Sequence, residues 1–218
     1  MALALFDLDR TLISVNSGRL WFDRERELGF LTRWQALRAA AWIGFYHLGF
    51  TRLDDVLKEA IAALEGDDES EIRDRSEAFY HSRVKTTYRP GGREAVARHQ
   101  EAGDTLALLT SSSNYLCAPV LTELGIPFAL CNRFETASGK FTGKPDGAIC
   151  YGEGKLVHAA AFAESQGQPL SEAAFYTDSI ADLPVLLAVG KPVAVNPDPR
   201  LRRLALKKNW EIVDWGVP

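Results

Sequence analysis

The stretch that decides the fold is residues 1–13, MALALFDLDRTLI. Its apolar run, residues 2–6, has no helical periodicity, and a short continuous run of this kind is typical of a strand buried on both faces of a parallel sheet. Two acids, Asp7 and Asp9, follow the run with one residue between them. We therefore expect a buried strand that ends in a pair of carboxylates.

The same kind of apolar run recurs along the chain. Further strands are predicted at residues 104–110, 126–131, 173–177 and 192–196. Helical patterns lie between them, at residues 93–103, 114–125, 154–167 and 180–189. Strands that alternate with helices of this length favour right-handed crossovers. The predicted fold class is α/β, a doubly wound parallel sheet.

Residues 14–89 break this alternation, because apolar residues there keep helical spacing and no convincing strand is found. The turn-forming sequence RPGG at residues 89–92 predicts a linker that returns the chain to the sheet. We expect residues 1–13 and 90–218 to form the α/β core, and residues 14–89 to form a small all-helical cap domain inserted after the first strand. Alternation around Ser138-Gly139 predicts a short β-hairpin within residues 132–144.

Composition restricts the functional classes. The formal net charge of -4 over 218 residues argues against a nucleic-acid partner. The three cysteines match no zinc-binding spacing and favour buried thiols in a reducing compartment. The longest apolar stretch, residues 39–50, is too short to span a bilayer. We expect a soluble cytoplasmic protein with no membrane partner; the alternative is a membrane-surface enzyme that uses residues 39–50 as an anchor.

Polar residues gather where the predicted strands end. Ligands of open α/β sheets bind outside the carboxyl ends of the strands. The candidates at these ends are Asp7, Asp9 and Thr11 after the first strand, Thr110 and Ser111 after the second, Asp178, Ser179 and Asp182 after the fourth, and Lys155 at the start of a helix. Each one alone could be a helix cap, a turn former or a solvated side chain. Together on one sheet edge they predict a site.

These residue types suit phosphoryl chemistry. Carboxylate oxygens bind Mg²⁺, which shares its coordination shell with water and phosphate. An aspartate can attack phosphorus and form an aspartyl-phosphate. A metal ion and a lysine offset the repulsion between carboxylate and phosphate. Hydroxyls and backbone N–H groups at a strand-to-helix turn can hold the phosphate oxygens.

In sequence, the chain resembles the haloacid dehalogenase superfamily, in particular its phosphoserine-phosphatase-like branch. The matching motifs are Asp7-Leu8-Asp9-Arg10-Thr11, Thr110, Lys155 and the run TDSIADLP at residues 177–184. The helical insert and the stretches CNRFETASGKFTG and CYGEGK are similar to that branch as well. Arg10 and Thr177 occupy positions where glycine is common in the family. Arg10 would add charge or bulk at the entrance of the site and so influence substrate preference.

The resemblance implies a role for each residue. Asp7 would be the nucleophile, and Asp9 the general acid and then the general base. Thr110, the Ser111 backbone and Lys155 would hold the phosphate, and Lys155 would also orient Asp7. The remaining implied roles are Mg²⁺ binding by Asp7, Asp178 and the Asp9 carbonyl, with Thr11, Ser179 and Asp182 in support.

The resemblance also implies a Mg²⁺-dependent phosphatase for a small phosphorylated metabolite, enclosed by the cap. Histidinol phosphate and phosphoserine are substrates in this branch, and the overall similarity favours histidinol phosphate. Possible substrate contacts are Ser17, Arg24 and Arg133, among cap candidates that include Asn16, Arg19, Trp21, Glu25 and Arg38. The alternatives are a phosphotransferase that uses an alcohol acceptor and a non-catalytic phosphometabolite-binding protein. The oligomeric state is not specified.

Overall fold

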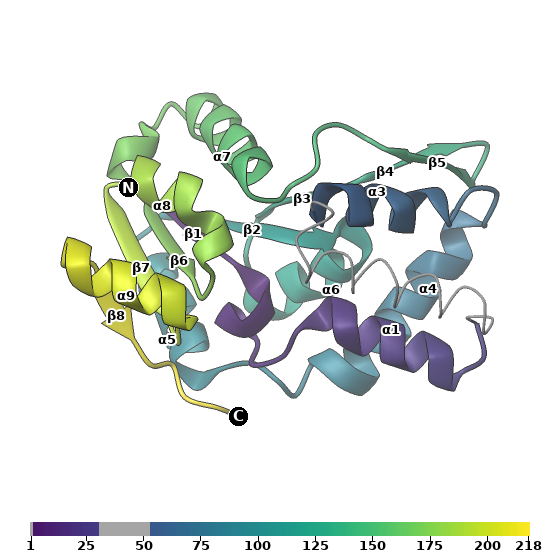
Figure 1. The fold of residues 1–218 in the computed structure, drawn as a ribbon, viewed down its shortest axis with the longest axis horizontal. Helices are drawn as coiled ribbons and strands as arrows, with labels where there is room; N and C mark the ends of the chain where they lie inside the picture. The colour runs from purple at the N-terminus through teal and green to yellow at the C-terminus, as the bar shows by residue number, and fades with distance from the viewer. Residues whose placement is uncertain (1, 31–52) are drawn as a thin grey trace.

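A six-stranded parallel sheet forms the centre of the protein (Figure 1). The computed structural model describes residues 2–30 and 53–218. The strand order is β3-β2-β1-β6-β7-β8, and every neighbouring pair is parallel. The strands are β1 Leu3–Phe6, β2 Thr105–Ser113, β3 Phe128–Asn132, β6 Ala174–Thr177, β7 Lys191–Val195 and β8 Glu211–Val213. The predicted α/β fold class is confirmed.

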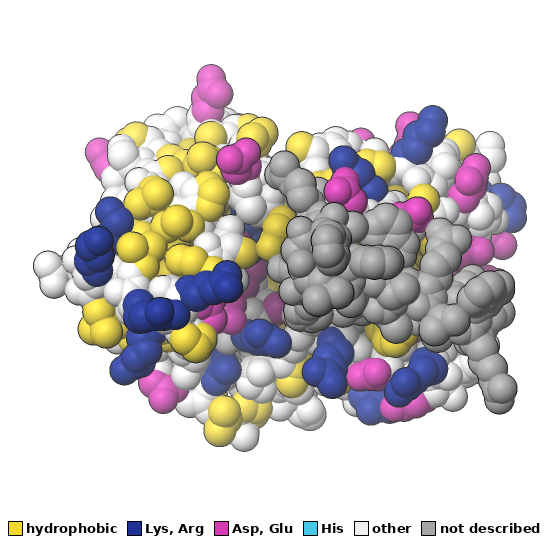
Figure 2. All heavy atoms as spheres, in the orientation of Figure 1, with side chains coloured by type: hydrophobic (Ala, Val, Ile, Leu, Met, Phe, Trp, Pro, Cys, Tyr) yellow, Lys and Arg dark blue, Asp and Glu magenta, His cyan; other side chains and the backbone are white. Residues whose placement is uncertain are grey.

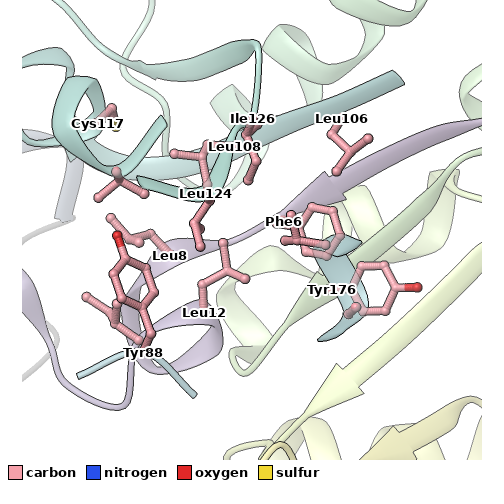
Figure 3. Packing of buried hydrophobic residues seen from close by; sticks show 14 of the residues in the cluster. Phe6, Leu8, Leu12, Tyr88, Leu106, Leu108, Cys117, Leu124, Ile126 and Tyr176 are labelled. Carbon is pink, nitrogen blue, oxygen red and sulfur yellow. The ribbon is translucent and has the colours of Figure 1, made fainter. Parts of the chain in front are cut away.

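Helices cover both faces of this sheet. They are α5 Pro90–Glu101, α6 Asn114–Leu124, α7 Glu153–Ser165, α8 Leu183–Ala188 and α9 Pro199–Lys208. Side chains of β1 alternate between two core clusters: Ala4 and Phe6 belong to one, and Leu3 and Leu5 to the other. Figure 3 shows Phe6 packed among residues of the first cluster, beside Tyr176. Because both faces of β1 are buried, its sequence is apolar at every position.

The described part of residues 14–89 is helical. It contains α1 Ser17–Glu27, α3 Leu53–Ala62, α4 Glu69–Phe79 and a wide helical turn, Tyr80–Val84. The two connections to the core lie side by side, since Ile13 pairs with Tyr88 and the Ser14 N–H donates to the Thr87 carbonyl at 2.8 Å. This pairing supports the expected cap boundaries, which remain a proposal.

Arg38 and the apolar stretch 39–50 lie outside the described residues. Among the helices that are described, none combines the length and hydrophobicity that a membrane span requires.

The predicted β-hairpin is present as β4 Phe134–Ala137 and β5 Lys140–Pro145. Its turn residues, Ser138 and Gly139, have φ angles of 53° and 78°, and hairpin turns with two positive φ angles match the twist of the strands. Phe141 of β5 packs with Ile72 of α4 and Tyr115 of α6. The hairpin therefore connects the helical segment to the core.

The expected linker at residues 89–92 is wrong beyond Arg89, because α5 begins at Pro90. Proline is well suited to the first position of a helix, where its missing N–H costs nothing. The two glycines serve packing: a Cβ on Gly91 would lie 2.6 Å from the Trp215 ring, and one on Gly92 would lie 3.2 Å from it. The sequence RPGG therefore marks the start of a helix whose first residues pack against the Trp215 ring.

Helix α9 and strand β8 were not predicted from the sequence. The helix buries Leu201 and Ala205 against the sheet. Its Lys and Arg side chains point to solvent, and Figure 2 shows dark blue side chains gathered over this end of the core. Strand β8 has only three residues and begins with an exposed glutamate. Its apolar run is too short to give a strand signal by itself.

Candidate active site

The turn that follows β1 fixes the two predicted acids. The Asp7 N–H donates to the Tyr176 carbonyl at 2.9 Å, which anchors the end of β1 to β6. Residues Leu8–Leu12 then form a wide turn, in which Asp9 and Arg10 have non-helical backbone angles, and a hydrogen bond from the Ile13 N–H to the Leu8 carbonyl closes it. Arg10 has a φ of 58°, in the left-handed region, which explains why glycine suits this position. Arg10 itself is exposed.

Lys155 lies between two carboxylates. Its Nζ donates to Asp7 Oδ1 at 2.8 Å and to Asp182 Oδ2 at 2.9 Å, and its side chain is only 3% exposed. Thr177 Oγ1 donates to the same Asp182 oxygen at 2.6 Å. Burial opposes the charge on Lys155, but the carboxylates of Asp182 and Asp7 outweigh it and hold the pKa of the ammonium above its usual value. Lys155 is therefore a fixed positive charge beside Asp7.

Thr11 connects the β1 and β6 ends of the site. Its hydroxyl donates to Asp7 Oδ2 at 3.3 Å and accepts the Asp178 N–H at 3.0 Å. Burial raises the pKa of Asp7 to about 7, although Lys155 opposes the rise. Burial and the nearby charges of Asp7 and Asp182 raise the pKa of Asp178 to about 8. Asp7, Asp178 and Asp182 accompany one buried lysine, which contacts only Asp7 and Asp182, so the site holds more buried carboxylates than this lysine balances.

Asp9 is held by the start of α1. Its Oδ1 accepts the Ser17 N–H at 2.7 Å, and burial raises the pKa of its carboxyl. Ser17 is buried and lies at the site, where both its backbone N–H and its side chain hydrogen-bond to Asp9. Ser179 lies beside Thr177, whose hydroxyl accepts the Ser179 N–H at 3.2 Å.

The other two predicted substrate contacts have different surroundings. Arg24 is half-buried and pairs with the buried Glu25 at 3.1 Å. Arg133 is exposed and lies 3.6 Å from Asp146. Within the described ranges, their hydrogen bonds and ion pairs do not include the acids of the site. Their roles remain predictions.

Thr110 and Ser111 lie where β2 turns toward α6. Thr110 is buried, and its Oγ1 accepts the Ser112 N–H at 3.2 Å. Ser113 caps α6, because its hydroxyl accepts the Leu116 N–H at 3.4 Å. The N-terminus of α6 thus faces the same sheet edge as Asp7, and such a turn favours a bound anion.

Two residues of the site were not predicted as functional: Thr177, whose hydroxyl contacts Asp182, and Asn132. Asn132 Nδ2 donates to the Ser111 carbonyl at 2.6 Å. It is a buried polar residue at the end of β3. The same rule that selected residues at the other strand ends would have selected it.

The carboxylates of the site are suited to binding a divalent cation. No three His, Cys, Asp or Glu side chains in residues 2–30 and 53–218 form a closed metal centre. Mg²⁺ does not need one, because it commonly binds one or two protein carboxylates and completes its shell with water and phosphate. Burial, together with the neighbouring carboxylates, raises the pKa values of Asp7 and Asp178, so negative charge there is costly without a cation. A divalent cation would compensate that charge.

Comparison with known proteins identifies the family. The family model for haloacid dehalogenase-like hydrolases matches residues 4–187. The chain therefore belongs to this family, as its sequence motifs predicted, and it is a phosphoric monoester hydrolase.

Two curated relatives match almost the whole chain. Phosphoserine phosphatase SerB1 of Mycobacterium tuberculosis is 33% identical over 99% of this chain and 71% of its own length. The histidinol-phosphatase of Neisseria meningitidis is 30% identical, and the match covers 98% of both proteins.

Solved structures share the fold. A protein of unknown function from Bordetella pertussis superposes with a TM-score of 0.91 at 29% identity, over 99% of each chain. A phospho-aspartyl intermediate analogue of phosphoserine phosphatase has a TM-score of 0.67 at 17% identity, over 99% of this chain and 94% of the other. The second likeness supports the fold alone.

Proposed function

We propose that the protein is a Mg²⁺-dependent phosphatase that hydrolyses a small phosphate monoester through an aspartyl-phosphate on Asp7. The observation that carries this proposal is the setting of Asp7, whose two carboxylate oxygens contact Lys155 at 2.8 Å and Thr11 at 3.3 Å. Lys155 offsets the charge of an approaching phosphate, and both contacts hold the carboxylate in one orientation.

In the first step a carboxylate oxygen of Asp7 attacks phosphorus, and the bond between phosphorus and the substrate's alcohol oxygen breaks. Asp9 donates a proton to that oxygen. The raised pKa of Asp9 supports this role, since it keeps the proton available at a higher pH than an ordinary aspartate would. Ser17 fixes the orientation of the Asp9 carboxyl.

In the second step Asp9 accepts a proton from water as the water oxygen bonds to phosphorus. The bond between phosphorus and Asp7 breaks, which releases inorganic phosphate and restores the Asp7 carboxylate. The Thr110 hydroxyl, the Ser111 backbone and Lys155 hold the phosphate oxygens during both steps. Asp9 therefore regains in the second step the proton that it donated in the first.

Mg²⁺ would be held by the Asp7 and Asp178 carboxylates and by the Asp9 backbone carbonyl, with Asp182 keeping Lys155 in place. When bound, the ion would neutralise charge on the phosphate and the acids. The excess of carboxylates over lysine supports this assignment.

The favoured substrates are histidinol phosphate and then phosphoserine, both phosphate monoesters of small amino alcohols. The match to a histidinol-phosphatase over 98% of both proteins supports the first, and the match to SerB1 supports the second. Either would place the protein in amino-acid biosynthesis. A cytoplasmic location is part of the proposal, supported by the free, buried thiols of Cys117, Cys131 and Cys150.

Release of inorganic phosphate from a panel of esters tests the proposal. The panel contains histidinol phosphate, phosphoserine, sugar phosphates, nucleotides and an aryl phosphate, with Mg²⁺ present and the Asp7→Asn protein as the blank. We expect one amino-alcohol phosphate to exceed the others in kcat/KM. Activity on the aryl ester alone would support the chemistry but contradict the substrate assignment, and no release from any ester would contradict the function.

A further inference from the structure

Asn132 connects two parts of the site that are distant in sequence. The residue is 3% exposed. The Nδ2 group donates to the Ser111 carbonyl at 2.6 Å, and Oδ1 accepts the Cys150 N–H at 2.8 Å. One partner is an acceptor and the other is a donor, so an amide satisfies both, whereas a carboxylate would oppose the Ser111 carbonyl oxygen.

The bond to Ser111 lies where the pairing of β2 with β3 is irregular. The register of β2 against β3 shifts between Leu109, which pairs with Leu130, and Ser113, which pairs with Asn132. The longer β2 segment between these pairs bulges away from β3 at the predicted phosphate-binding turn. A bulge leaves backbone groups without ladder partners and redirects the chain. The Asn132 side chain donates to the Ser111 carbonyl within this irregular segment.

This bond also sets the direction of the next N–H group. In a trans peptide the C=O and N–H groups point in opposite directions. With the Ser111 carbonyl held by Asn132, the Ser112 N–H points the other way and donates to Thr110 Oγ1 at 3.2 Å. That hydrogen bond uses a lone pair of the Thr110 hydroxyl oxygen. The hydroxyl proton can therefore be donated to a phosphate oxygen.

The second bond reaches the segment that leads to Lys155. Cys150 lies three residues before α7, which begins at Glu153 and carries Lys155. The Asn132 amide therefore bridges the turn after Thr110 and the approach to the lysine.

We propose that Asn132 is a positioning residue for phosphate: it orients the peptide unit after Ser111 and keeps that turn in register with Lys155. This inference rests on the proposed function of the site and adds a determinant of phosphate affinity that lies outside the four sequence motifs. Asn132 acts through Thr110, Ser112 and Lys155 and does not itself contact the phosphate.

The test compares Asn132→Asp and Asn132→Ala with Gln100→Glu as a matched control. Gln100 Nε2 also donates to backbone carbonyls, those of Leu124 and Gly125 at 2.9 and 3.0 Å, but at the opposite end of α6. Binding of inorganic phosphate in the presence of Mg²⁺ is measured by titration calorimetry, and the melting temperature, kcat and KM are measured for each protein.

We expect both Asn132 variants to bind phosphate at least about tenfold more weakly and to show a raised KM, since the Ser111 carbonyl loses the hydrogen bond that orients it. The control should keep the wild-type phosphate affinity, and it should lose less thermal stability because Gln100 is exposed. Phosphate affinities of the Asn132 variants within twofold of wild type would overturn the proposal. So would equal weakening in Gln100→Glu, or failure of both Asn132 variants to fold, because either would indicate a role in stability alone.

The binding measurement separates this inference from the proposed function. A wild-type protein that binds phosphate but releases none from any ester would contradict the phosphatase, while the effect of Asn132 on binding would still be measured. A wild-type protein that binds no inorganic phosphate would overturn the inference itself.

Discussion

Asp7 illustrates how much a single side chain depends on its neighbours. It is 6% exposed and would be costly to ionise without Lys155. We expect Asp7→Asn to lower kcat by more than about 1000-fold, as removal of a nucleophile does in other enzymes. The amide keeps the shape of the side chain, so the melting temperature should not fall. Steady-state phosphate release measures the effect, and residual activity within tenfold of wild type would contradict the nucleophile assignment.

Asp9 is expected to act in both chemical steps. Loss of a general acid and base typically costs about 100- to 10,000-fold in rate, and Asp9→Asn should slow both formation and hydrolysis of the aspartyl-phosphate. The Ser17 N–H can still donate to the amide oxygen, so substrate binding should persist. Acid quenching followed by mass spectrometry would detect accumulated phospho-protein. Unchanged steady-state rates would refute the role.

At the scale of elements, the packing of the first turn of α7 against the loop before it places Lys155. A Cβ on Gly154 would lie 1.9 Å from the Ile149 carbonyl oxygen, a contact that backbone atoms cannot relieve without moving. We expect Gly154→Ala to destabilise the fold by about 2 kcal/mol or more, within the range for overpacking a tight site, and to lower activity because Lys155 moves with the helix. Chemical denaturation and phosphate release measure the two effects.

Gly18 is the control for that substitution. It lies in the first turn of α1, where a Cβ would meet Asn16 Oδ1 at an ordinary 3.6 Å. Gly18→Ala should therefore be neutral or stabilise the protein by up to about 1 kcal/mol. Equal destabilisation by the two substitutions would contradict the packing argument at Gly154.

For the whole molecule, the buried acids predict how stability depends on pH. The pKa values of Asp7 and Asp178 rise to about 7 and about 8, whereas in the unfolded chain both groups titrate near pH 3.9. Their protonated forms therefore contribute stability that is complete below about pH 4 and is lost as the pH rises through 7 and 8. In EDTA, the melting temperature should fall between pH 5 and pH 9.

Mg²⁺ should reverse that loss, because it competes with protons for the same carboxylates. The rise in melting temperature on adding Mg²⁺ should be larger at pH 8 than at pH 5, and smaller in Asp178→Asn. EDTA should also abolish phosphate release, and Mg²⁺ should restore it. Metal-independent turnover, or a melting temperature that does not respond to Mg²⁺ at pH 8, would contradict the metal assignment.

Sequence reasoning succeeded where the signal is local. The apolar run 2–6 predicts β1, and Ser138-Gly139 predicts the hairpin turn, since both features depend on neighbouring residues alone. It failed where a distant residue decides the outcome. From sequence alone, Gly91 and Gly92 were predicted to belong to a linker. In the structure they pack against Trp215, which lies far along the chain. Strand β8 is recognised as a strand by its pairing with β7.

The sequence by itself determined the class of fold and the edge of the sheet at which the acids meet, because parallel strands bring their carboxyl ends together whatever the detailed packing. Only the tertiary structure determined which residues of the site contact one another. Lys155 contacts Asp7 across 148 residues of sequence, and Asn132 bridges Ser111 and Cys150. The raised pKa values likewise arise from burial, which is a property of the folded chain and not of any short stretch within it.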